Sequence, residues 1–131
     1  MVVIFVVAHA PLASALVACA RHVLGAHPDL YLFDIEPHEC ASSSSPRLAA
    51  EIIAADQGQG VLILTDLPGA TPSNIAAAAS NIAQAQGVSC RVLGGVNASM
   101  LLKTINYRSA ALDVVVEKAL AGATQAVLRV D

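Results

Sequence analysis

The sequence alternates repeatedly between short apolar runs and longer segments with helical spacing. Runs such as "VVIFVVA" (residues 2–8) and "GVLILTD" (60–66) are rich in β-branched residues and lack the polar alternation of a half-exposed strand. Between such runs, "PLASALVACARHVLG" (11–25) places apolar residues three or four positions apart, as on one face of a helix. This alternation predicts a mostly parallel sheet joined by right-handed helical crossovers.

The same patterns predict one doubly wound α/β domain over residues 1–131, with helices on both faces of the sheet. The expected strands cover residues 2–8, 30–35, 60–66, 89–96 and 124–130. The expected helices cover residues 11–25, 46–58, 72–87, 98–107 and 109–122. Ser45 is expected to cap the second helix, with Pro46 at its first position, and Thr71 to cap the third.

Composition narrows the class of protein. Hydrophobic residues make up 56% of the chain, which is enough for a sizeable core, and the net charge is -3 without any basic cluster. Nucleic-acid binding is therefore not expected. The three cysteines form no CxxC pair, and no Lys or Arg precedes the apolar N-terminal run as it would in a signal peptide. We expect a cytoplasmic protein.

Chemistry-bearing residues follow several of the expected strands. His9 follows the first strand, Asp66 ends the third and Asn97 follows the fourth, so all three are expected at the carboxyl edge of the sheet, where such folds bind ligands. Helices are expected to start at Pro11, at Pro72 and directly after Asn97. Helix N-termini attract anions through their N–H groups and dipoles. This constellation suits a phosphoryl group on His9.

The residue types fit that chemistry. A neutral imidazole attacks phosphorus through one bare nitrogen, and a carboxylate that accepts a hydrogen bond from the other nitrogen fixes which one it is. Asp66 is the candidate carboxylate, because its strand is expected to neighbour the first, and Thr71 is the candidate hydroxyl for a phosphoryl oxygen. Each also has an ordinary structural interpretation: a polar strand end, a turn residue and a helix cap. Their joint placement at one edge of the sheet favours phosphoryl chemistry over these structural interpretations.

The sequence gives less support for other kinds of functional site. His22, His27 and His38 are expected at the surface, and no metal site is expected because none of their spacings is the i, i+4 of a helical metal pair. The chain has neither GxGxxG nor a P-loop motif. Two other classes stay open: a flavodoxin-like small-cofactor binder, and a non-catalytic regulatory interaction module.

Three motifs together resemble the IIA component of the mannose-type sugar phosphotransferase system over essentially the whole chain. They are His9 after the first strand, "TDLPGATPSN" (65–74) at the third and "GGVNASM" (94–100) after the fourth. The resemblance implies a phosphotransferase component with a phosphohistidine intermediate and no cofactor. A histidine-containing carrier protein would donate the phosphoryl group, which would pass to a IIB partner or serve regulation. Contact with the membrane would be indirect, through a permease complex.

The resemblance also assigns roles to residues. His9 corresponds to the phosphorylated residue, Asp66 to its orienting carboxylate and Thr71 to the hydroxyl at the phosphoryl group. The residues expected to line the phosphoryl group are Ala10, Gly69, Ala70 and Asn97. A homodimer is implied, with the C-terminal strand crossing to the partner's sheet. The chain departs from the family at Ala10, at Ala70-Thr71 and at Ala98-Ser99, where the family commonly has Gly, Gly-Ser and Leu-Pro.

Overall fold

The apolar runs form a four-stranded parallel sheet in the computed structural model, which describes residues 1–25 and 29–131. The strands are β1 (Val3–His9), β2 (Leu30–Ile35), β3 (Val61–Thr65) and β4 (Cys90–Leu93). Their order is β2-β1-β3-β4, with all neighbours parallel. The chain thus winds outward from β1 on one side and from β3 on the other, which confirms the doubly wound sheet.

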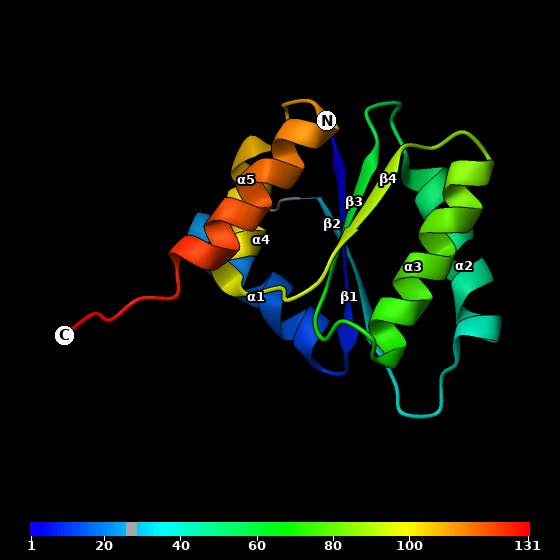
Figure 1. Ribbon diagram of the computed structural model, residues 1–131, viewed down its shortest axis with the longest axis horizontal. Helices are drawn as coiled ribbons and strands as arrows, with labels where there is room; N and C mark the ends of the chain where they lie inside the picture. The colour runs from blue at the N-terminus through cyan, green and yellow to red at the C-terminus, as the bar shows by residue number, and fades with distance from the viewer. Residues whose placement is uncertain (26–28) are drawn as a thin grey trace.

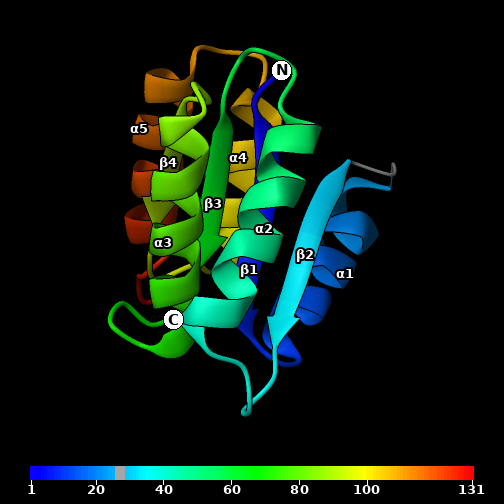
Figure 2. The ribbon, with the colours of Figure 1, turned by 90° about the vertical axis from the view of Figure 1, so that its right-hand side faces the viewer.

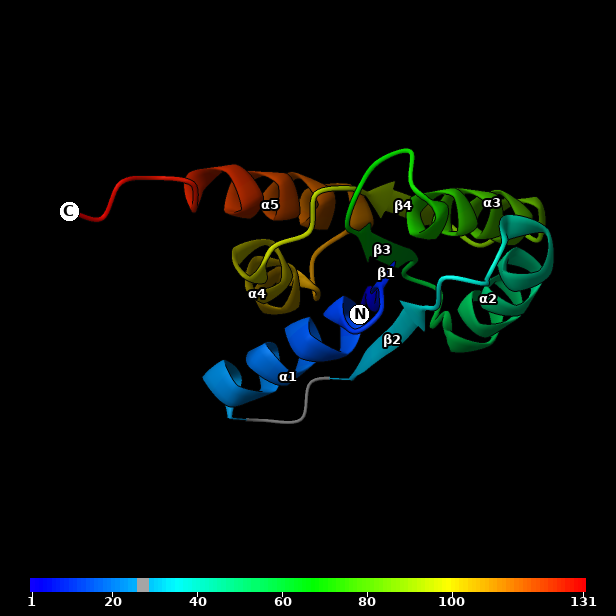
Figure 3. The same ribbon diagram turned by 90° about the horizontal axis from the view of Figure 1, so that it is seen from below.

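Helices cover both faces of the sheet, as expected for parallel strands joined by crossovers. They are α1 (Leu12–Leu24), α2 (Ala41–Ala55), α3 (Thr71–Ala85), α4 (Ala98–Tyr107) and α5 (Leu112–Gln125). Helices α1, α4 and α5 lie on one face, and α2 and α3 on the other (Figures 1 and 3). Figure 2 shows α2 and α3 side by side in front of the sheet. Among the described residues, no helix combines the length and the hydrophobicity needed to cross a bilayer.

Burial on both faces explains the uninterrupted apolar run of β1. Phe5 and Val7 pack under α2 and α3, whereas Ile4 and Val6 pack under the opposite helices, and all four are fully buried. Each such side chain contributes about 1.5–3 kcal/mol of burial free energy. His9 is the first exposed residue of the strand. The strand therefore carries a polar side chain out of the core at its carboxyl end.

The second helix begins earlier than predicted. Ser45 and Pro46 were expected at its start, but α2 begins at Ala41, and both residues lie inside it. Ser45 is buried, and its hydroxyl donates to the carbonyl of Ile75 in α3 at 3.3 Å. Small serine side chains let α2 pack closely on α3, and this packing outweighs their modest helix propensity and the missing N–H of Pro46. The helix also ends before Gly58.

Two other helix starts differ from the prediction by one position. Thr71 is the first residue of α3 and not its cap; the cap position is held by Ala70, which has no capping side chain. Pro11 is the cap residue of α1 and precedes the first helical residue. In both places a proline near the helix start had been identified correctly, because proline suits the first turn. The hydroxyl of Thr71 is therefore not used as a cap.

The expected C-terminal strand over 124–130 is absent from this single chain. Helix α5 continues through Gln125, and residues 126–131 lead away from the helical layer (Figure 1). Val127, Leu128 and Val130 are 82%, 64% and 95% exposed. A strand requires a hydrogen-bonded neighbour, and this segment leaves α5 away from the sheet. The crossing to a partner's sheet stays a prediction, because one chain cannot test it.

Candidate functional site

Pairing of β1 with β3 brings His9 and Asp66 together. Val7 is in register with Thr65, so the residues that follow at the carboxyl edge come into contact. Nδ1 of His9 lies 2.6 Å from Oδ2 of Asp66, and the backbone N–H of His9 donates to the same oxygen at 3.0 Å. Asp66 is thus bonded to both the main chain and the ring of His9.

The ionisation of Asp66 determines which ring nitrogen of His9 donates a hydrogen bond to it. Burial acts to raise the pKa of Asp66, but the hydrogen bonds from the ring and backbone of His9 outweigh it and leave this pKa below its usual value. The carboxylate is therefore ionised at neutral pH and can only accept, so Nδ1 of His9 donates. The other nitrogen, Nε2, takes no part in this contact, and the side chain that carries it is 48% exposed. In a neutral imidazole that donates through Nδ1, Nε2 is the nitrogen with the lone pair.

Two cavities at this edge are lined in part by His9. The first, of about 200 Å³, is lined by His9, Ala10, Ile35, Glu36, Pro37, Thr71 and Pro72. The second, of about 500 Å³, is more open and mainly apolar, and is lined by His9, Leu12, Asp66, Leu67, Gly95 and Val96. Thr71, the first residue of α3, lines the first cavity together with His9, and its role at a phosphoryl group stays a prediction. Asp66 faces the second cavity.

Four helices, α1 to α4, begin at this edge, and the N-termini of α1, α3 and α4 differ in how they are capped. Both carboxylate oxygens of Asp34 bond to Ser14 in the first turn of α1, through its backbone N–H and its hydroxyl. Asn97 caps α4 by accepting from the N–H of Met100 at 2.8 Å. The cap position of α3 carries no capping side chain, and its first turn borders the cavity at His9. Of these three N-termini, that of α3 is the best placed to attract an anion beside His9.

The four residues expected to line the phosphoryl group all have hydrogen-bond partners within the protein. The N–H groups of Ala10, Gly69 and Ala70 donate to the Ile35 carbonyl, the Ser73 hydroxyl and the Leu67 carbonyl, respectively. The Asn97 amide accepts from the N–H of Met100 and donates to the Ala123 carbonyl at 3.1 Å. Ala10 borders the cavity beside His9. A role in phosphoryl binding stays a prediction for all four.

Some residues at this edge were not expected from the sequence. Ser73 closes the loop before α3, since its hydroxyl accepts from the N–H of Gly69 at 2.9 Å and donates to the Ala70 carbonyl at 3.0 Å. Glu36 lines the cavity at His9 from the loop after β2. The sequence does place an acidic residue, Asp34, at the end of an expected strand. Its pairing with Ser14, however, depends on where α1 packs. Local sequence carries no such information.

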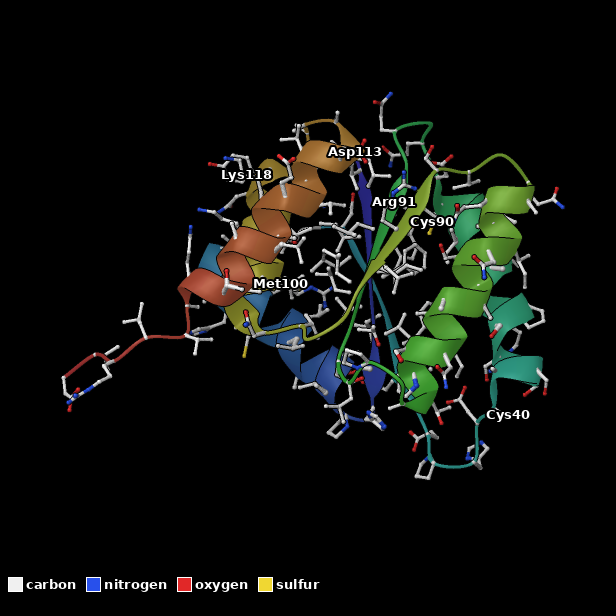
Figure 4. All side chains as sticks on the ribbon, viewed as in Figure 1. Cys40, Cys90, Arg91, Met100, Asp113 and Lys118 are labelled. Carbon is white, nitrogen blue, oxygen red and sulfur yellow. The ribbon has the colours of Figure 1, made fainter. Side chains whose placement is uncertain are left out.

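The thiol of Cys40 lies at the same edge, directly before α2 (Figure 4). Its sulfur lies 3.2 Å from the hydroxyl of Ser42 and 3.2 Å from that of Ser43. These hydrogen bonds lower the pKa of Cys40 to about 7. Cys90, by contrast, is buried on β4, and burial raises the pKa of its thiol. The two thiols therefore differ in their expected reactivity.

The other described histidines, His22 and His38, are exposed, as expected. His22 lies near the end of α1, and His38 lies in the loop after β2. His27 lies outside the described residues. No side chain of Phe or Tyr lines either cavity at His9: Phe5, Tyr31 and Phe33 stack on one another along the sheet, and Tyr107 lies on α4 beneath Lys103 and Lys118. A flavin site at this edge lacks the aromatic platform it typically uses.

Solved structures share this fold over nearly the whole chain. The phosphotransferase system component EIIA from Streptococcus agalactiae has a TM-score of 0.86 at 24% identity, covering 98% of this chain and 97% of its own. The mannose/sorbose specific IIA subunit from Enterococcus faecalis also has a TM-score of 0.86, at 22% identity and with 99% and 95% coverage. A PTS IIA protein associated with the fucose utilization operon of Streptococcus pneumoniae has a TM-score of 0.78 at 21% identity, with 99% and 96% coverage.

Sequence comparison gives a complementary result. A search of curated proteins finds no match. Residues 3–120 match the family described as "PTS system fructose IIA component", also called EIIA-man. This match spans strands β1 to β4 and the starts of α1 to α5, including the edge that carries His9, Asp66 and Thr71. The chain therefore belongs to the mannose-type IIA family of the phosphotransferase system, as the motifs indicated.

Proposed function

We propose that this protein is a phosphocarrier that takes up a phosphoryl group on Nε2 of His9. The observation that carries the proposal is the 2.6 Å contact between Nδ1 of His9 and an ionised Asp66, with the ring half exposed. A histidine-containing carrier protein is the donor, and a IIB protein the acceptor. Membership of the IIA family supports this role. The expected location is the cytoplasm.

The transfer step follows from the state of the ring. The lone pair of Nε2 attacks the phosphorus of the donor's phosphohistidine, so that one P–N bond forms as the donor's P–N bond breaks. The donor's imidazole leaves with the electron pair of that bond. His9 keeps the proton on Nδ1, and the positive charge that develops on its ring is stabilised by Asp66. Transfer to the IIB partner reverses these steps at His9.

The start of α3 provides a place for the phosphoryl oxygens. Thr71 borders the same cavity as His9, and its hydroxyl can donate to a phosphoryl oxygen. The first-turn N–H groups of a helix lack intrahelical partners and favour an anion by about 0.3–1 kcal/mol. Ala10, Gly69, Ala70 and Asn97 complete the proposed surroundings. In this proposal the Thr71 hydroxyl donates directly to a phosphoryl oxygen.

Intact-mass spectrometry tests the proposal. The chain is incubated with phosphoenolpyruvate and the general phosphocarrier proteins of the system, and a reversible, acid-labile gain of one phosphoryl group is expected. His9→Ala should abolish this gain. His38→Ala is the matched control, because His38 is an exposed histidine at the same edge, and it should be labelled like the wild type. A gain of mass that survives His9→Ala, or that maps to another histidine, contradicts the assignment.

We also propose that the C-terminal segment completes a homodimer. Residues 126–131 carry exposed apolar side chains beyond the end of α5 and pair with no strand among residues 1–25 and 29–131. Their alternation of apolar residues at Ala126, Leu128 and Val130 fits one face of a strand. Pairing with the sheet of a second copy would bury that face.

A further inference from the structure

The loop after β4 approaches the loop after β3 so closely that a side chain would not fit. A Cβ atom built on Gly94 would lie 2.7 Å from Cγ and 3.3 Å from Cδ of Pro68. Gly94 does not have the positive φ that favours glycine at Gly69 and Gly95. The need for glycine at this position is therefore one of space and not of backbone conformation.

The close approach accompanies two backbone hydrogen bonds to the residues around the site. The N–H of Gly95 donates to the carbonyl of Asp66 at 2.6 Å, and the N–H of Val96 donates to the carbonyl of Thr65 at 3.0 Å. His9 binds the Asp66 side chain from the β1 side. The backbone of Asp66 is thus held from β4 while its carboxylate is held from β1.

We propose that Gly94 is a positioning residue for the His9–Asp66 pair. By lacking a side chain, it lets the β4–α4 loop lie on Pro68 and hold the backbone of Asp66 at the distance where the carboxylate meets Nδ1 of His9. Gly94 itself contacts neither the ring nor the phosphoryl group. The inference rests on the proposed function for its effect on transfer, but its structural part concerns the unphosphorylated pair and stands separately.

A methyl group at position 94 has no easy relief. The proline ring is closed on the backbone and cannot rotate away as a flexible side chain could, so the loop that carries Pro68 must move. The same loop runs from Asp66 to Thr71, and both ends contribute to the site. A displacement of this kind by about 1 Å can cost on the order of 100-fold in rate. Gly94→Ala should therefore impair the site without removing any functional group.

The experiment is a double-mutant cycle with two measurements. Wild type, Gly94→Ala, Pro68→Ala and the double variant are compared by the rate of His9 phosphorylation and by NMR of the His9 ring nitrogens and the Nδ1 proton. In Gly94→Ala we expect a rate about 10- to 100-fold lower and loss or weakening of the Nδ1–H signal. Pro68→Ala alone should change both only slightly. The double variant should return to the level of Pro68→Ala, because the clashing ring atoms are gone.

Gly60→Ala is the control for a loss of stability away from the site; unlike Gly94, Gly60 has a positive φ of 93°, so this variant carries backbone strain as well as a steric clash. Gly60 precedes β3 at the opposite edge of the sheet, where an added Cβ would lie 2.9 Å from Leu112 Cδ2 and 3.0 Å from the Ser89 carbonyl oxygen. Arg91 and Asp113, labelled in Figure 4, lie at that edge. A guanidinium nitrogen of Arg91 is 3.9 Å from a carboxylate oxygen of Asp113. This variant should lose stability and yet keep the His9 signal and, while folded, the transfer rate.

The outcomes separate the two proposals. A wild type that shows the Nδ1–H signal but is never phosphorylated overturns the proposed function, whereas the NMR cycle still tests Gly94. If Gly94→Ala keeps the wild-type signal and rate, or if the double variant is as impaired as Gly94→Ala, the positioning role is overturned. Should Gly94→Ala fail to fold, the double variant decides alone: it must fold and show the signal of Pro68→Ala.

Discussion

One oxygen of Asp66 accepts two hydrogen bonds from His9, from the backbone N–H at 3.0 Å and from Nδ1 of the ring at 2.6 Å. The backbone bond ties the carboxylate to the end of β1, and the ring bond selects the nitrogen that keeps the proton. A single side chain directly after β3 therefore fixes both the position and the tautomer of the imidazole. The consequences of this arrangement can be measured separately for transfer and for stability.

The first prediction concerns phosphoryl transfer in Asp66→Asn. Asparagine can still accept from the ring, but it lacks the negative charge that stabilises a positively charged imidazole. We expect a folded variant with slower phosphorylation of His9; orienting carboxylates in unrelated nucleophile systems contribute up to about 10⁴-fold in rate. The measurement is the initial rate of labelling by intact mass, with circular dichroism as the folding control. Equal rates in the two proteins would make Asp66 a purely structural residue.

The second prediction concerns stability and pH. The pKa of Asp66 is lower in the folded protein than its ordinary value of 3.8. The ionised carboxylate therefore stabilises the fold at pH values above about 4, and this contribution is lost as the pH falls through the folded pKa. Urea unfolding of wild type and Asp66→Asn should show a difference at pH 6 that shrinks toward pH 3. A difference that grows on acidification would contradict the assigned shift.

The third prediction separates two roles of Asn97. Its oxygen caps α4, and its NH₂ group donates to the Ala123 carbonyl near the end of α5. Asn97→Ala should lower the free energy of unfolding by about 1 kcal/mol, and Asn97→Ser should recover much of it because a serine hydroxyl can cap the helix. Chemical denaturation measures both. If Asn97 also binds the phosphoryl group, Asn97→Ser should be phosphorylated slowly although it is stable.

The fourth prediction tests the C-terminal segment. Deleting residues 127–131 leaves α5 intact and removes most of the exposed apolar side chains of the tail. We expect the full chain to sediment as a dimer at micromolar concentration and the truncated chain to dissociate or aggregate. Leu128→Asp should weaken the dimer more than Arg129→Ser, which lies on the other face of the expected strand. Sedimentation of the full chain as a monomer would rule out the strand exchange.

The fifth prediction concerns Cys40. With a pKa of about 7, this exposed thiol should be largely ionised at pH 7.5 and react quickly with iodoacetamide. Replacing both Ser42 and Ser43 by alanine should raise the pKa and slow alkylation at that pH, because the two hydroxyls no longer donate to the sulfur. Exposed Cys19 serves as an internal reference in the same mass spectra. Unchanged alkylation of Cys40 would show that the hydroxyls do not control it.

The sequence by itself determined the parallel α/β class and the position of His9 and Asp66 at one edge. Both results follow from periodicity, because a strand buried on both faces must be apolar along its length and its first polar residue must mark its end. The pairing of β1 with β3 then brings those two ends together. The same reasoning placed Thr71 near a helix start at that edge, and its role toward a phosphoryl group stays a prediction.

Only the tertiary structure decided features that depend on contacts between distant segments. The start of α2 among serines follows from its packing on α3, and the carboxylate of Asp34 binds the first turn of α1 because the fold brings them together. The close approach of Gly94 to Pro68 joins two loops that are far apart along the chain. Periodicity reports which face of a segment is buried. It does not report which atoms of another segment meet that face, because such contacts arise only when the elements pack.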